Sequence, residues 1–211
     1  MRILQFHSLE EPAQEPVSLA EAKAQLRING FDEDEAISDH PDDALIEAMI
    51  SAAREHAELF TGLVLARRNV ICLASSFPEC RKPININTGP VLSVDDVSYY
   101  LDGELVPMSM SELHIETLAI PATISLPSSA SWPTADNRAG AVRIQLDAGY
   151  VAEPASDVEN ERLIPPSIKQ AILLLMSHMY ENREAVTDKP FALLPLGVES
   201  LLRRHRIRLG V

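Results

Sequence analysis

The residues that build disulfide and metal frameworks are scarce in this chain. Its 211 residues include only two cysteines, Cys72 and Cys80, which excludes a disulfide framework and a four-cysteine zinc site. Aromatic residues make up 5% of the chain. No apolar run approaches the roughly 18 residues of a membrane-spanning helix, and the first ten residues contain no apolar segment typical of a signal peptide. We therefore expect a protein of a reducing, cytoplasmic compartment.

Glycine is also scarce, with 8 residues against 15 prolines. Proline ends helices and interrupts strands, so the chain is predicted to contain many short elements rather than a few long helices. Apolar residues (46%) and charged residues (23%) occur in the proportions of a folded globular protein. The length suits one domain, and we expect residues 1–211 to form a single domain.

The net charge of −13 is unevenly distributed along the chain. Residues 1–61 carry 4 basic and 14 acidic side chains, residues 62–164 carry 7 and 13, and residues 165–211 carry 7 and 4. The acidic first third would be repelled by a phosphate backbone, which argues against duplex binding there. The basic C-terminal end could contact nucleic acid, an acidic partner or the acidic body of a neighbouring copy, or it could be a solvated terminus.

Two helices are predicted in an N-terminal helical hairpin of residues 17–62. Ser18 and Glu21 have the spacing of a capping box, which predicts a helix from Leu19 to about Ile28. Three- and four-residue apolar spacing predicts a second helix over residues 44–60. Its expected buried stripe is Leu45, Ile46, Met49, Ile50, Ala53, Ala57 and Phe60, and its expected exposed face is Glu47, Arg54, Glu55 and Glu58.

An inserted β region is predicted over residues 64–147, where the apolar spacing changes to every second residue. Asp102-Gly103 predicts a tight type I′ hairpin turn, because that turn needs positive φ at both central residues. Prolines divide the region into short segments, which indicates a small, irregular antiparallel sheet. The expected strands are residues 69–73, 84–87, 94–101, 104–108, 122–126 and 141–146.

Helical spacing returns in the C-terminal helices, residues 165–204. Pro165 and Pro166 favour a helix start, and the helix that follows is apolar almost all round, including Ile172 and Leu175. Such a helix lies in the centre of a fold or in an oligomer interface. A short fourth helix precedes a basic tail of residues 205–211. The predicted fold class is α+β: a mainly helical bundle of about four helices, with a small antiparallel β insert between helices 2 and 3.

No catalytic or cofactor-binding motif is present in the sequence. The chain lacks G-x-S-x-G, a P-loop, G-x-G-x-x-G and H-E-x-x-H. His56, His114, His178 and the acidic residues could still assemble in space into the site of a small metal-dependent enzyme, so this alternative stays open. The absence of these motifs favours an interaction protein, and we expect no enzymatic activity, cofactor or metal.

Eight short stretches occur together in an order that resembles the head–tail connector (adaptor) proteins of long-tailed phages, prophages and gene transfer agents. The order and spacing carry the resemblance, from about residue 17 to residue 207, and no single stretch is specific. The stretches are residues 17–23 (VSLAEAK), 42–58 (DDALIEAMISAAREHAE), 61–62 (TG), 131–133 (SWP), 148–150 (AGY), 165–174 (PPSIKQAILL), 180–184 (YENRE) and 196–202 (LGVESLL).

The resemblance implies a structural virion component without catalytic activity. Such proteins form a homo-oligomeric ring, a dodecamer in the particle, between the portal and a stopper or tail-completion protein. DNA only passes through the lumen, no membrane is involved, and the protein moves from the cytoplasm during assembly to the head–tail junction. The portal-binding residues are then expected in the C-terminal segment: Leu201, Leu202, Arg203, Arg204, Arg206 and Arg208. A DNA-packaging or regulatory DNA-binding protein that uses this basic tail remains the alternative.

Overall fold

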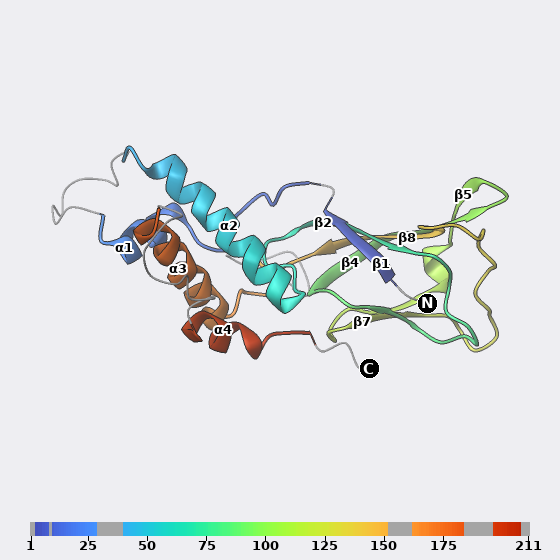
Figure 1. The fold of residues 1–211 in the computed structure, drawn as a ribbon. Coiled ribbons are helices and arrows are strands. Elements are labelled where there is room, and N and C mark those ends of the chain that lie inside the picture. Colours follow the sequence, from blue (N-terminus) through green and yellow to red (C-terminus); the bar gives the residue numbers. More distant parts are fainter. Residues whose placement is uncertain (1–2, 9, 29–39, 152–161, 184–195, 208–211) are drawn as a thin grey trace.

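The computed structural model describes residues 3–8, 10–28, 40–151, 162–183 and 196–207. These residues form an elongated body with its helices at one end and its strands at the other (Figure 1). The elements are β1 (Ile3–Ser8), α1 (Leu19–Leu26), α2 (Asp43–Thr61), β2 (Arg68–Ala74), β3 (Ile84–Ile86), β4 (Val91–Leu101), β5 (Glu104–Pro107), a short 3₁₀ helix (Met110–Glu112), β6 (His114–Glu116), β7 (Ala122–Ser125), β8 (Val142–Ala148), α3 (Pro166–Glu181) and α4 (Leu196–Arg203).

The strands form two antiparallel sheets. The five-stranded sheet has the order β1-β2-β8-β4-β5, and the three-stranded sheet has the order β3-β7-β6. Strand β8 lies at the centre of the larger sheet, where Ile144 is opposite Cys72 of β2 and Val97 of β4. Buried and half-buried residues alternate along β8, so one face of the sheet packs into the core.

The prediction of a mainly helical bundle with a small β insert is wrong. The described residues contain four α-helices and eight strands, and the sheets make up a share of the body comparable to that of the helices (Figure 1). Each of the six predicted strands is found, but β1 and β6 were not predicted. Strand β1 is N-terminal to both hairpin helices and pairs with β2, so the sheet is not confined to the insert. Strand pairing of this kind is a long-range property that local spacing does not reveal.

Each end of the body has its own apolar core. In the helical core, Ile46 and Ile50 of α2 pack with Ile172 and Met176 of α3. In the sheet core, Ile144 of β8 packs with residues of both sheets. Ile172 and Leu175 are buried, as the sequence predicts. The central position predicted for α3 is thus confirmed within the helical half.

Local sequence signals explain where α1 begins and where α2 ends. The Ser18 hydroxyl accepts a hydrogen bond from the Glu21 amide at 3.3 Å, and the Glu21 carboxylate accepts one from the Ser18 amide at 3.0 Å, so the predicted capping box is confirmed. Helix α1 ends at Arg27, which has φ of 57°. Helix α2 ends at Gly62 with φ of 76°, a left-handed conformation that glycine adopts readily.

Three residues of α2 differ in burial from their prediction. Leu45 was expected in the buried stripe but is 39% exposed. Arg54 was expected in solvent but is only 5% exposed, and the side chain of Glu58, also expected in solvent, is 11% exposed. Arg54 is buried because carboxylates surround it, which apolar spacing alone does not predict.

The hairpin between β4 and β5 has the predicted turn. Asp102 and Gly103 have φ of 53° and 85°, both positive as type I′ requires. The Asp136 carboxylate accepts hydrogen bonds from both turn amides, at 3.0 and 2.9 Å. The sequence also predicts an acidic loop at residues 31–41 and a linker at residues 190–196, and both fall almost entirely outside the described residues.

Candidate functional site: the C-terminal segment and an acidic groove

Helix α4 uses its apolar side within the chain itself. Val198 and Leu202 are fully buried in the helical core, and Leu201 packs against the same core while half-buried. Of the two predicted portal-contacting leucines, Leu202 is therefore inaccessible to a partner in this conformation. Its side chain instead fixes the position of α4 on α3 and α2.

The chain beyond α4 also lies against the body. The His205 ring nitrogen Nε2 is 2.8 Å from the Ser167 hydroxyl at the start of α3, and the Ile207 amide donates to the Thr61 carbonyl oxygen at 2.8 Å. Partial burial, together with the charge of Arg204, lowers the pKa of His205. Residues 205–207, the start of the predicted basic tail, therefore lie against the folded body.

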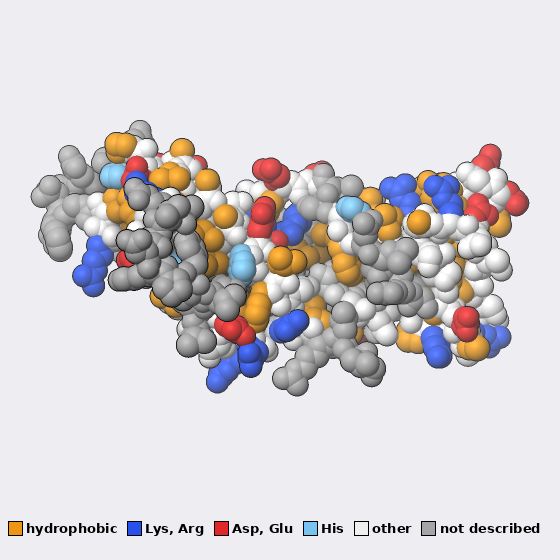
Figure 2. All heavy atoms as spheres, in the orientation of Figure 1, with side chains coloured by type: hydrophobic (Ala, Val, Ile, Leu, Met, Phe, Trp, Pro, Cys, Tyr) orange, Lys and Arg blue, Asp and Glu red, His pale blue; other side chains and the backbone are white. Residues whose placement is uncertain are grey.

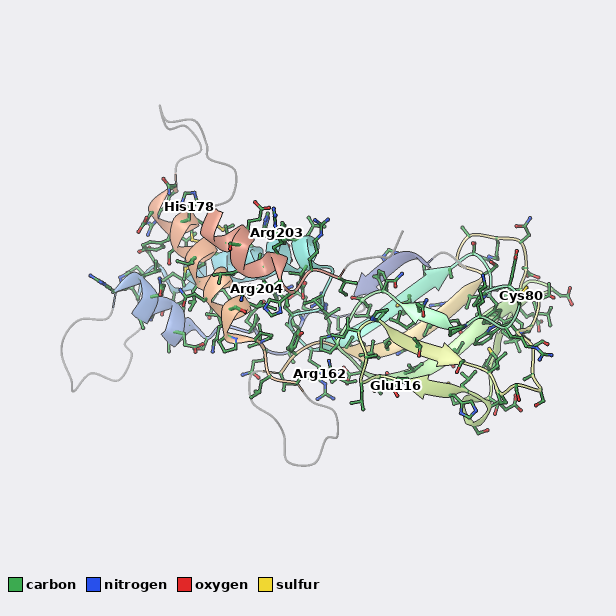
Figure 3. The ribbon with its side chains drawn as sticks, turned by 90° about the horizontal axis from the view of Figure 1, so that it is seen from below. Cys80, Glu116, Arg162, His178, Arg203 and Arg204 are labelled. Carbon is green, nitrogen blue, oxygen red and sulfur yellow. The ribbon has the colours of Figure 1, made fainter. Side chains whose placement is uncertain are left out.

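Three of the four predicted arginines lie in the described part of the chain, and all three are exposed. Arg203 and Arg204 project from the end of α4 (Figure 3), and the Arg203 guanidinium donates to the Glu199 carboxylate at 2.6 Å. The Arg206 guanidinium carbon is 5.6 Å from the centre of the Phe60 ring. Arg208 lies outside the described residues. The arginines thus give this edge of the helical half a positive charge.

A groove of about 410 Å³ lies on α2, where the helical half meets the sheet half. The groove was not predicted from the sequence, although the i, i+4 spacing of Arg54 and Glu58 indicates an ion pair. Acidic side chains predominate in its lining: Glu10, Glu11, Pro12, Glu15, Ser51, Arg54, Glu55, Glu58 and Arg68.

Two arginines of the groove, Arg54 and Arg68, neutralise part of its acidic charge. The Arg54 guanidinium donates to the Glu15 carboxylate at 2.8 Å and to the Glu58 carboxylate at 3.0 Å. Burial alone would lower the pKa of Arg54, but the hydrogen bond to Glu15 and the charges of Glu58 and Glu15 outweigh it, so the pKa is raised. The Glu55 side chain is 70% exposed and 3.9 Å from Arg54. The rim therefore remains acidic.

The histidines considered for a metal site are spread over different elements. His56 lies on α2, His114 on β6 and His178 on α3. Within the described ranges, no three His, Cys, Asp or Glu side chains are grouped as metal ligands. Cys72 is buried, which raises the pKa of its thiol to about 12, and Cys80 is exposed. Among the described helices, none combines the length and the hydropathy needed to cross a membrane.

Comparison with known proteins gives matches only among solved structures. No family model matches the chain, and no curated protein matches it. The neck of an empty gene transfer agent particle, computed with C6 symmetry, contains a chain that superposes with a TM-score of 0.74 at 20% sequence identity, covering 99% of this chain and 98% of that one.

Two further gene transfer agent structures match over the same extent, 99% of this chain and 98% of theirs. A chain of the native virion superposes with a TM-score of 0.71 at 20% identity. A chain of the native neck, computed with C12 symmetry, superposes with a TM-score of 0.69 at 19% identity. The chain therefore has the fold of a protein found in gene transfer agent necks. At the level of the fold, the resemblance to head–tail connectors of gene transfer agents is confirmed.

Proposed function

We propose that this chain is a structural virion component at the head–tail junction, where it forms an adaptor ring between the portal and the stopper or tail-completion protein. The observation that carries the proposal is the fold shared with a gene transfer agent neck chain over 99% of this chain. Agreement over the whole length includes both the helical half and the sheet half. The protein assembles in the cytoplasm, acts in the particle and has no enzymatic activity.

A closed ring is part of the proposal. The neck structures that match were computed with C6 and C12 symmetry, which supports a ring of twelve copies for this chain as well. A net charge of −13 suits a ring through which DNA passes, because a surface of like charge does not retain a phosphate backbone.

The C-terminal segment is the proposed portal-binding element. Leu202 anchors α4 on the body, Leu201 lies half-exposed beside it, and the arginines from Arg203 to Arg208 supply the charge. The guanidinium group of arginine can donate two parallel hydrogen bonds to one carboxylate, so an acidic portal surface is the expected counterpart.

Loss of the gene tests the function. In a phage or gene transfer agent that encodes this chain, its deletion should leave DNA-filled heads without tails, visible by electron microscopy. Purified protein added to those heads should restore tail joining. Complete particles formed without the protein would contradict the adaptor function.

A charge-neutralising variant tests the portal contact. Arg206→Gln/Arg208→Gln should bind isolated heads at least tenfold more weakly than the natural protein, and the natural protein should bind more weakly as salt rises. Arg81→Gln/Lys82→Gln removes the same charge at the sheet end and should bind normally. Equal binding by both variants would exclude the arginines as the contact. A salt-dependent affinity for free DNA, lost only in the first variant, would favour the DNA-binding alternative instead.

A further inference from the structure

Helix α2 has an apolar outer face. Leu45 and Leu59, which are 39% and 85% exposed, lie on the side of α2 that faces away from α3, and exposed Ala48 and Ala52 lie between them. Leu59 is the most exposed large apolar side chain in the described residues. The solvent-facing side of a surface helix normally carries charged and polar residues. Apolar residues in their place indicate a face that is covered in the assembly.

The acidic groove borders this outer face. Glu55 lies on the same side of α2 as Leu59, and its side chain is 70% exposed. Glu11 also lines the groove and is exposed. A partner that covers Leu59 therefore meets carboxylates at the edge of the contact. The matching surface must combine apolar groups with cations.

The chain itself has a cationic surface on the other side of α2. Phe60 follows Glu58 by two residues, so it lies about half a turn round the helix from the groove. Arg206 stacks over Phe60, and Arg203 and Arg204 project from the neighbouring end of α4. Figure 2 shows acidic side chains on the upper surface at mid-length and basic side chains along the lower edge of the helical half. The two charged surfaces thus lie on opposite sides of the same layer.

We propose that the outer face of α2, centred on Leu59, binds the α4 end of a second copy, with Arg203 and Arg204 of that copy directed at Glu55 and Glu11. The proposal rests on the ring of the proposed function and names the contact that builds it. Two different surfaces on opposite sides give a head-to-tail contact, the type that closes into a ring. In the assembled ring, Arg203 and Arg204 contact the neighbouring copy, which narrows the portal contact proposed above to Arg206 and Arg208.

Mixing two defective variants tests this contact in the full-length protein. Leu59→Asp damages only the α2 face, and Arg204→Glu damages only the α4 end, so each variant alone should self-associate at least tenfold more weakly than the natural protein in analytical ultracentrifugation. An equimolar mixture should form 1:1 dimers and nothing larger, because one intact contact remains. Leu101→Asp, the same substitution at an exposed leucine of the sheet end, should associate normally.

Cross-linking at high protein concentration gives a second measurement, because it traps contacts that are too weak to isolate. A chain with Leu59→Cys, Arg204→Cys and Cys80→Ser is concentrated and treated with a short bis-maleimide linker, while Cys72 remains buried. A ladder of linked oligomers is expected from the double-cysteine chain, and either cysteine alone should give almost none. Dimers from Leu59→Cys alone would mean a symmetric contact and overturn the proposal, as would the absence of a ladder.

The two proposals fail in different ways. A protein that restores tails to heads but gives no ladder retains the adaptor function and loses this contact. A protein that forms the ladder but never enters particles retains the contact and loses the adaptor function.

Discussion

Glu58 of α2 and Arg68 of β2 form a two-pronged ion pair that joins the helical half to the sheet half. The Arg68 nitrogens Nη1 and Nη2 donate to Glu58 Oε1 and Oε2, each at 2.8 Å. The same carboxylate accepts hydrogen bonds from Arg54 at 3.0 Å and from the Leu65 amide at 2.7 Å. One side chain therefore links the helical half to the sheet half.

Glu58→Gln should destabilise the protein by on the order of 3 kcal/mol, because the change leaves two largely buried guanidinium groups without their shared charge. Urea denaturation followed by circular dichroism measures this loss. Glu55→Gln is the matched control. The Glu55 side chain is 70% exposed and lies 3.9 Å from Arg54, a long and solvated ion pair, so the effect should stay below about 0.5 kcal/mol. Equal effects of the two changes would show that the ion pair of Glu58 and Arg68 contributes no more to the free energy of unfolding than an exposed carboxylate does.

Local sequence signals predicted the elements of this fold better than their assembly. Ser18 with Glu21 and Asp102 with Gly103 gave a helix start and a turn, because both signals act within a few residues. Strand β1 carries no comparable signal, and its pairing with β2 depends on residues about 65 positions apart. The extent of the sheet was therefore underestimated.

The surface residues were also predicted only in part. Arg203, Arg204 and Leu202 were all predicted to bind the portal, and the two arginines are exposed whereas Leu202 is buried. The burial of Arg54 depends on Glu15, which is 39 residues earlier in the chain. The spacing of residues within one helix gives no information about such a distant partner, so the groove was not predicted.

Ile172→Ala should cost on the order of 2–5 kcal/mol, because Ile172 is fully buried in the helical core and its loss leaves a cavity. Leu59→Ala, at 85% exposure, should change the free energy of unfolding of the isolated subunit by less than about 0.5 kcal/mol. Denaturant melts at low protein concentration provide both values. A change below 0.5 kcal/mol for Ile172→Ala would mean that the helical core lies elsewhere.

Two glycine substitutions should act in opposite directions. Gly149 has φ of +130°, and an added Cβ would lie 2.6 Å from the Arg67 backbone, so Gly149→Ala should cost on the order of 3 kcal/mol or more. Gly197 lies in α4 with no atom within 4 Å of an added Cβ, so Gly197→Ala should stabilise by about 0.5 kcal/mol. Thermal unfolding measures both shifts. Destabilisation by Gly197→Ala would contradict the position of α4.

Acidification should weaken the docking of the C-terminal segment. The pKa of His205 is lowered in the folded protein by burial and by Arg204, so on acidification the unfolded chain binds this proton first. The stability that neutral His205 contributes is therefore complete above about pH 6.5 and falls as the pH drops from 6.5 towards the lower folded pKa. His205→Gln should remove this part of the pH dependence in melts between pH 7 and 5. An unchanged pH profile would show that the pair with Ser167 does not hold the segment.

The location of the protein in the particle tests the central proposal most directly. Particles are purified from cells in which this chain carries a small epitope tag, and bound gold-labelled antibody is imaged by electron microscopy. The adaptor function predicts label only at the junction of head and tail, in heads that have received the protein as well as in complete particles. Label at the capsid shell or the tail tip, or particles that contain none of this protein, would contradict it.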